Sequence, residues 1–208
     1  MKKRIFLLPM AVLALLLMAF QCEDDKQTLF GNELKAQFSE GANLNIRDTL
    51  WVSGRVSANV YDSELRDSVF DPNFDFSSQF SLSKLIRVST DRTNEIEIGD
   101  GLGDFVIVNR TGTSERVGCT NSELTINAVL LQDDSFYSYE IGLVPQMSGD
   151  YILHFYSGTQ IVNSNRNLNI LGDYPTGASN PSLTCRDCCR GFGLDVQATE
   201  NDFLFSVD

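Results

Sequence analysis

The chain has 208 residues, 28 of them acidic and 16 lysine or arginine, and a formal net charge of −12 at pH 7. Nucleic-acid binding depends on cationic groups that displace counterions from phosphates, and the sequence shows no basic stripe to offset this negative charge. The composition therefore argues against nucleic acid as a partner.

Residues 1–21 have the pattern of a secretory signal peptide. A basic start, Met1–Arg4, is followed by an almost wholly apolar run, Ile5–Phe20. This run has about 16 residues, whereas a helix that crosses a bilayer needs about 20. We therefore predict a cleaved signal in preference to a transmembrane anchor. Three basic residues leave with the signal, so the remaining chain has 13 basic residues against 28 acidic ones, a net charge of about −15.

Cys22 follows the apolar run directly and precedes three acids in the stretch MAFQCEDDK. With Leu17, Met18 and Ala19 upstream, the stretch resembles the lipobox of bacterial lipoproteins. In that family the signal is cut just before the cysteine, whose thiol carries diacylglycerol and whose amine is acylated. The acids Glu23–Asp25 resemble the export tag of Bacteroidota-type outer-membrane surface lipoproteins. The resemblance implies a lipid anchor at Cys22; the alternative is an ordinary signal peptide, with Cys22 left as a thiol.

The mature chain is expected to consist of a tether followed by one domain. We assign residues 22–40 to the lipidated N-terminus and tether, because the sequence after Cys22 is polar and lacks hydrophobic periodicity. Residues 41–208 would form the domain. Two or three acyl chains hold a protein stably on a membrane, since each buried methylene contributes about 0.8 kcal/mol. The acidic chain has no electrostatic attraction to anionic lipid, so outer-membrane contact is expected through the N-terminal lipid.

The domain contains six stretches in which apolar and polar residues alternate with a period of two. Such alternation over five to nine residues indicates half-buried strands. In the first stretch it puts Val52 on one face and Trp51 with Arg55 on the other. Shorter candidates are KLIRVS from Lys84, EIEIG from Glu95 and DFVIV from Asp104. The six stretches are Thr49–Ser57, Phe74–Leu82, Leu124–Leu130, Tyr137–Leu143, Tyr151–Tyr156 and Phe203–Val207.

Turn-forming sequences separate these stretches, and helical patterns are scarce. No window of a dozen residues has convincing helical spacing, so we expect only short helices, at Asn32–Phe38 and at Asp62–Asp67. Many short strands with turns rich in glycine, asparagine and aspartate indicate an all-β fold, an antiparallel sandwich or barrel. The turn sequences are DPN at Asp71, GDGLGD at Gly99, MSGD at Met147 and GDYPTG at Gly172.

The stretch MSGDYILHFYSG, residues 147–158, resembles the penultimate strand of immunoglobulin-like domains. In those domains a tyrosine after a Gly-Asp entry forms a tyrosine corner, in which its hydroxyl bonds the backbone a few residues upstream. The resemblance implies that Tyr151 is this tyrosine and that the fold is an immunoglobulin-like antiparallel β-sandwich. The alternative is a tyrosine that merely begins a strand.

Four cysteines follow Cys22 in the chain, and an even number in an exported protein indicates disulfides first. One of the three possible pairings joins the neighbours Cys188 and Cys189 through a strained eight-membered ring. We therefore predict a long-range bridge from Cys119 to Cys188 or Cys189, and a local bridge from Cys185 to the other of these two. A zinc site built from the four thiolates and free thiols are the alternatives.

His154 is the only histidine, so a Ser–His–Asp or Cys–His catalytic set would have to use it. It lies in YILHFY on the strand face opposite Leu153 and Phe155. No Gly-x-Ser-x-Gly motif is present and no cysteine has an activating neighbour, so we interpret His154 as a solvent-facing strand residue. A glycosidase needs only two carboxylates close in space, and nothing in the sequence selects such a pair.

Two acidic turns and an asparagine-rich stretch also offer polar ligands. The acids at 100–104 and 132–134 could supply calcium with oxygen, but their spacing does not match an EF-hand loop, so we interpret them as turn formers. Asparagines occupy every second position from Asn163 to Asn169, which on a strand would give an amide-rich face for sugar hydroxyls. Asparagine is depleted in strands, so we favour a polar outer face or a loop. No metal ion or other cofactor is predicted.

These features predict a non-enzymatic accessory lipoprotein, anchored in the outer membrane and exposed at the cell surface. The first hypothesis is a ligand- or glycan-binding protein, with Trp51 as its aromatic platform if this side chain faces outward. The second is a scaffold subunit that docks on an outer-membrane transporter or secretion complex through an apolar patch or an unpaired sheet edge. The third is a hydrolase with carboxylates around His154.

Overall fold

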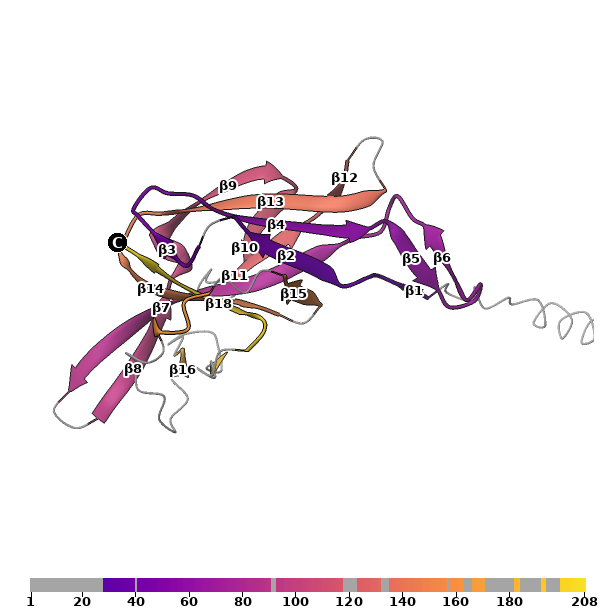
Figure 1. The fold of residues 1–208 in the computed structure, drawn as a ribbon. Helices are drawn as coiled ribbons and strands as arrows, with labels where there is room; N and C mark the ends of the chain where they lie inside the picture. The colour runs from indigo at the N-terminus through magenta and orange to yellow at the C-terminus, as the bar shows by residue number, and fades with distance from the viewer. Residues whose placement is uncertain are drawn as a thin grey trace, which may run out of the picture.

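The structure, a computed structural model, is built from β-strands in two large sheets that lie face to face (Figure 1). A small three-stranded sheet extends from one end of them (Figure 1). The structure describes residues 28–39, 41–90, 93–117, 123–131, 135–156, 158–162, 166–170, 182–183, 192–193 and 199–208. The fold is an all-β, mainly antiparallel sandwich, which confirms the fold class that the alternating sequence predicts.

The first large sheet, the β7 sheet, is centred on the long strand β7. Strand β8 pairs with the second half of β7 and extends it as a hairpin. All neighbours are antiparallel except β18 and β3, which run parallel. In spatial order its strands are β10 (Thr113–Val117), β11 (Glu123–Asn127), β7 (Ser77–Thr90), β14 (Gly149–Phe155), β18 (Asp202–Val207) and β3 (Asn43–Leu44), with β8 (Thr93–Asp100) beside β7.

The second large sheet, the β4 sheet, covers the β7 sheet and carries the candidate site described below. Strand β9 shares one edge of β13 with β12, and β15 runs parallel to β2 at the other side of the sheet. In spatial order its strands are β12 (Val129–Leu130), β13 (Phe136–Pro145), β4 (Leu50–Ser57), β2 (Leu34–Phe38) and β15 (Thr159–Ile161), with β9 (Phe105–Thr111) beside β13.

The small sheet at the end, which we call the tip sheet, contains β1 (Leu29–Phe30), β5 (Asn59–Asp62) and β6 (Asp67–Phe70). A separate two-stranded pair is formed by β16 (Ser182–Leu183) and β17 (Phe192–Gly193), and a 3₁₀ turn, η1 (Leu102–Asp104), precedes β9. Strands β1 and β2 fall within the segment 22–40 that was assigned to the tether, so this segment contributes to two sheets. Within the described ranges, no helix has the length and apolarity needed to cross a bilayer.

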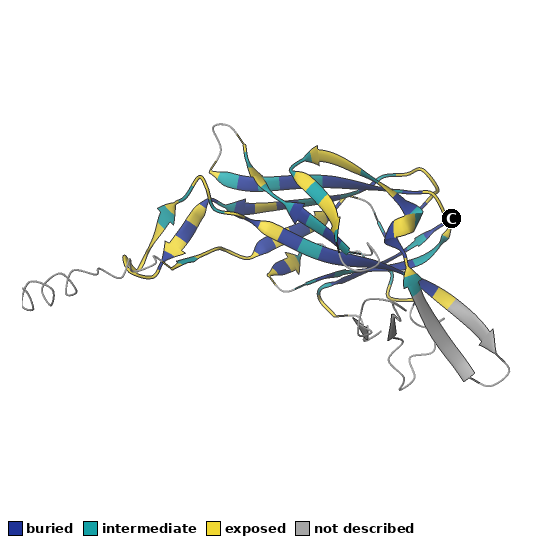
Figure 2. Ribbon diagram, turned by 180° about the vertical axis from the view of Figure 1, so that it is seen from behind, coloured by how far each residue is buried: buried dark blue, intermediate teal, exposed yellow. Residues whose placement is uncertain are grey.

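The core lies between the two large sheets, toward which strands such as β2 and β4 turn every second side chain. Buried and less buried residues alternate along β4, and Val52 and Val56 belong to the buried core. Figure 2 shows such alternation in the strands of the sandwich. Phe38 of β2 stacks on Phe203 of β18 with 3.8 Å between ring centroids, which joins the two sheets. Aromatic pairs of this kind add about 0.5–1.5 kcal/mol beyond the area that they bury.

Both expected helices are wrong. Residues 34–38 form strand β2, in which Leu34, Ala36 and Phe38 are buried and the two residues between them are exposed. Residues 62–67 form the turn of the β5–β6 hairpin instead of a helix. The Asp62 carboxylate closes this turn by accepting backbone N–H groups at 2.8 and 3.1 Å, a local bond that competes with helix formation.

Tyr151 makes the hydrogen bond that defines a tyrosine corner. Its hydroxyl donates to the backbone carbonyl of Met147 at 3.0 Å and lies 2.8 Å from Asp104 Oδ2. Burial and the neighbouring carboxylate raise the pKa of Tyr151, so the hydroxyl keeps its proton and donates. Lys84 also contacts Asp104 Oδ2, at 2.8 Å. The hydroxyl of Tyr151 therefore connects the turn before β14 to the turn before β9.

We expect Tyr151→Phe to lower the free energy of unfolding by about 1–3 kcal/mol, because Asp104 and the Met147 carbonyl lose a partner. Tyr139 offers a matched control, since its hydroxyl is buried and has no hydrogen-bond partner within the described chain. Tyr139→Phe should leave the free energy unchanged or raise it. Urea denaturation of both variants beside the parent measures the difference, and equal losses would contradict the tyrosine-corner assignment.

Candidate functional site

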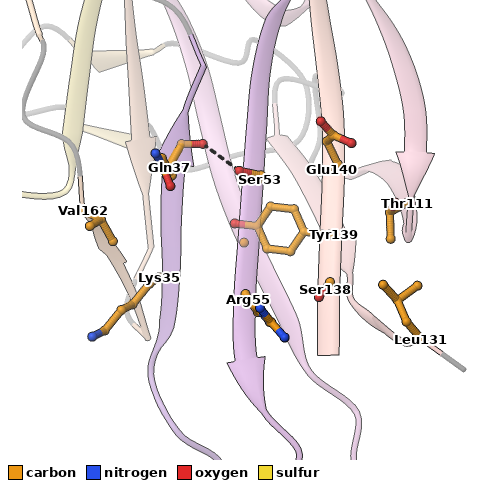
Figure 3. Close-up of a pocket in the computed structure, with 11 residues that line it drawn as sticks. Lys35, Gln37, Ser53, Arg55, Thr111, Leu131, Ser138, Tyr139, Glu140 and Val162 are labelled. Atoms are coloured by element: carbon orange, nitrogen blue, oxygen red, sulfur yellow. Dashed lines mark hydrogen bonds between the residues drawn. The ribbon is translucent and has the colours of Figure 1, made fainter. Parts of the chain in front are cut away.

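A groove of about 470 Å³ lies on the outer face of the β4 sheet, across β2, β4 and β13 (Figure 3). Its floor is made of two cross-strand rows, because the strands are paired so that outward residues stand opposite one another. One row runs Lys35–Arg55–Ser138, and the other runs Gln37–Ser53–Glu140. The site therefore presents six polar side chains on a regular grid.

The middle strand has a glycine beneath the groove, on the side of the sheet that faces the core. Gly54 faces the core, and an added Cβ there would lie 2.2 Å from Cε1 of Tyr139. The ring of Tyr139 fills this space from the opposite position on β13 and is 1% exposed. Both residues line the groove, and Tyr139 lies between its two polar rows (Figure 3). Leu131 and Val162, both exposed, form apolar rims on its two sides.

A β-bulge places a third cation beside the groove. The pairing of β9 with β13 shifts register between Glu140 and Ile141, so that Arg110 has no residue opposite it. A bulge of this kind turns a side chain away from the regular alternation. Here Arg110 reaches Glu140, with 2.7 Å between Nη1 and Oε1. The bulge thus fixes the carboxylate at the end of the second row.

Each arginine of the site stacks on an aromatic ring. The guanidinium carbon of Arg110 lies 3.6 Å from the ring centroid of Trp51, and that of Arg55 lies 3.9 Å from the centroid of Phe136. Gly142, opposite Trp51, leaves room for the indole, because a Cβ there would meet the ring at 2.9 Å. Such cation–π contacts contribute about 0.5–1 kcal/mol at exposed sites and hold the guanidinium groups in fixed positions.

The charge of the groove differs from that of the rest of the chain. Lys35 and Arg55 stand directly opposite each other on neighbouring strands, in a protein with a net charge of −12. Like charges in directly opposite positions of a sheet repel each other, although Arg55 also interacts with other groups, among them the ring of Phe136. The two cationic side chains lie at one end of the groove, where they suit an anionic group. The amide, hydroxyl and carboxylate groups of the second row can both donate and accept hydrogen bonds.

Trp51, the candidate aromatic platform, faces outward on β4 as the alternation predicts, and is half-buried. It lies next to the groove but not in its lining. Since the guanidinium of Arg110 covers one face of the ring, a sugar could stack on that face only by displacing the arginine. The structure thus makes Trp51 a support for Arg110, and its role as a platform stays a prediction.

His154 lies on the outer face of β14, opposite the buried Leu153 and Phe155, as the sequence predicts. Its Nδ1 lies 2.7 Å from Oδ1 of Asp202, which is 2% exposed. Thr199 donates its backbone N–H and its hydroxyl to Asp202 Oδ2, at 2.6 and 2.7 Å. Among the described residues, no hydroxyl nucleophile is hydrogen-bonded to His154. The pair joins β14 to the start of β18.

The remaining candidates of the sequence do not form a site in the described chain. Asp100 accepts a hydrogen bond from the backbone N–H of Leu102 at 2.9 Å, and Asp104 contacts Lys84 and Tyr151. Both carboxylates of this turn therefore bind groups of the protein itself. No three metal-ligating side chains converge in the ranges that the structure describes. The following residues lie outside those ranges: Cys22, Cys119, Cys185, Cys188, Cys189, Asn163, Asn165 and residues 132–134.

Comparisons with protein-family models, with curated proteins and with solved structures found no match to this chain.

For most groove residues, the sequence predicted at most that they lie on the polar face of a strand, and not that they form a site. The alternation of residues 49–57 put Ser53 and Arg55 on the outward face, which the structure confirms. Sequence reasoning missed Lys35 and Gln37, because their segment was expected to be helical. It also missed Arg110, since no local pattern marks the bulge in β9.

Proposed function

We propose that this chain is a lipid-anchored outer-membrane protein, attached through Cys22 and exposed at the cell surface, that binds a hydroxyl-rich glycan carrying an anionic group. The observation that carries the proposal is the pair of opposed cations, Lys35 and Arg55, in a groove whose other polar groups donate and accept hydrogen bonds. Binding leaves the glycan chemically unchanged.

The proposal is supported by how firmly the polar groups are held. Side chains on strands of a sheet move less than those on loops, and Arg55 and Arg110 are further fixed by aromatic rings. Rigid donors cost little conformational entropy when they bind a ligand. A groove of about 470 Å³ accommodates a few sugar rings at most, so an end or a short internal segment of a chain would bind.

We expect Lys35→Gln to weaken the binding of acidic oligosaccharides by about threefold to tenfold, because one of the two opposed cations is lost. Neutral oligosaccharides should bind with little change. Arg66→Gln, which removes an exposed cation from the tip sheet's turn, is the matched control and should have no effect. An array of neutral and acidic oligosaccharides tests all three proteins. A silent array, or equal losses in both variants, would contradict the proposed ligand.

A second candidate function, docking of this chain as a scaffold subunit on an outer-membrane complex, is favoured by the edge strand β9. In the described chain β9 pairs only with β13, so its other side is available to a partner strand. Val106 and Val108 are exposed on this strand, by 51% and 40%. Lys35 and Arg55 lie on β2 and β4, so substitutions of these two groove residues leave the docking edge of β9 intact.

A further inference from the structure

The tip sheet has one buried face and one exposed face, and the exposed face is aromatic. Val60 is buried and its cross-strand partner Val69 is partly buried, on the inner face. On the outer face, Phe30 of β1 stands opposite Tyr61 of β5, and Phe70 of β6 stands opposite Asn59, diagonal to Tyr61. Leu65 adds an apolar side chain in the hairpin turn between β5 and β6.

These four residues, which we call the tip patch, are the most exposed apolar cluster with aromatic members in the described chain. The exposed fractions are 54% for Phe30, 44% for Tyr61, 65% for Leu65 and 52% for Phe70. Every exposed aromatic side chain among the described residues belongs to this patch. Tyrosine is enriched where a protein meets the interface of a membrane with water, because its ring is apolar and its hydroxyl is polar, and phenylalanine and leucine bury apolar area at the same depth.

The chain enters the described structure beside the tip patch. Thr28 begins it, and the Thr28 carbonyl accepts the backbone N–H of Ser63 in the hairpin turn at 3.3 Å. Thr28 lies only six positions after Cys22, a distance that spans about 20 Å at most when the chain is fully extended. A lipid at Cys22 therefore holds the hairpin turn and the tip patch within reach of the bilayer surface.

We propose that the tip patch rests in the interface of the outer membrane, and that it orients the sandwich with its long axis away from the bilayer. This inference rests on the proposed anchor at Cys22. The β7–β8 hairpin lies at the opposite end of the molecule from the tip sheet (Figure 1). In the proposed orientation this hairpin points away from the membrane. The groove of the β4 sheet then faces sideways, above the lipid and open to glycans.

The charges around the patch favour an apolar contact over an electrostatic one. Arg66 in the turn is flanked by the exposed acids Glu64 and Asp67. With two acids against one cation, the turn has no electrostatic attraction to anionic lipid, so the contact of the patch with the membrane is apolar. Zwitterionic lipid is therefore a sufficient test surface.

The test uses the full lipoprotein, reconstituted in phosphatidylcholine vesicles with brominated acyl chains, which quench tryptophan in contact with them. In a Trp51→Phe background, the Phe70→Trp variant carries its reporter in the tip patch, and the Val106→Trp variant carries it on β9 at a site of similar exposure. We expect quenching of at least about twofold for Phe70→Trp and almost none for Val106→Trp. If the Trp51→Phe background does not fold, the same difference is measured with Trp51 retained.

Vesicle flotation separates this inference from the anchor on which it rests. Protein that does not float with the vesicles overturns both the anchor and the orientation. Protein that floats, but whose Phe70→Trp reporter is not quenched, overturns the orientation alone. A third outcome is a Phe70→Trp reporter that bromine does not quench but that is shielded from water, more so as the protein density on the vesicles rises. This result would show a second copy of the chain on the patch and would also overturn the proposed orientation.

Discussion

Gly54→Ala is expected to lower the free energy of unfolding by about 3 kcal/mol, which is the upper range for added volume in a packed core. The new methyl group would lie 2.2 Å from Cε1 and 2.3 Å from Cζ of Tyr139. The ring cannot move aside easily, because it is 1% exposed and packed between the sheets. Urea denaturation of the variant beside the parent measures the loss.

Two further variants show whether the loss comes from this contact. Gly103→Ala is the matched control, because the nearest atom to its new methyl group lies 3.4 Å away, and we expect a small effect. Tyr139→Leu removes the ring atoms that collide, so the double variant with Gly54→Ala should lose about 1–3 kcal/mol less than the sum of the single variants. Additive losses, or a Gly54→Ala variant as stable as Gly103→Ala, would show that the ring yields to the methyl group.

The stretches predicted as strands lie mostly within strands of the structure, short ones such as Phe203–Val207 in β18 included, and the clearest of them have long, strict alternation. Residues 49–57 and 137–143 alternate over seven or more positions, and only the two-residue period of a strand fits such a long pattern. The segment at residues 34–38 is too short for this. Leu34 and Phe38 are four residues apart, which fits one face of a helix as well as one face of a strand. This segment is a strand because it pairs with β4. The local sequence of the segment carries no information about that pairing.

The candidate site was less predictable than the fold, because it depends on register. Ser53 was correctly placed outward, but the rows that it forms with Gln37 and Glu140 require three strands from distant parts of the chain to pair at a fixed offset. A shift of one residue would turn all these side chains to the other face. The contact of His154 with Asp202 has the same origin, since the two residues are 48 positions apart and meet only through β14 and β18.

Cys22→Ala is expected to move the protein almost completely from the membrane fraction to the soluble fraction, because the only acyl chains are proposed to be on this residue. Each buried methylene contributes about 0.8 kcal/mol, so two or three chains outweigh any contact that the four side chains of the tip patch make with lipid. Density-gradient flotation of cell envelopes measures the distribution, and incorporation of a labelled fatty acid detects the lipid directly.

Gln21→Ala is the control for Cys22→Ala. It changes the neighbouring residue to the small type usual before a lipobox cysteine, and should keep the protein labelled and membrane-bound. If the Cys22→Ala variant stays on the membrane without label, the lipobox interpretation is wrong. Combining it with Phe30→Ser and Phe70→Ser then locates the attachment. Release by these changes would make the tip patch the main anchor, whereas continued binding would point to a partner protein, as expected of a scaffold subunit.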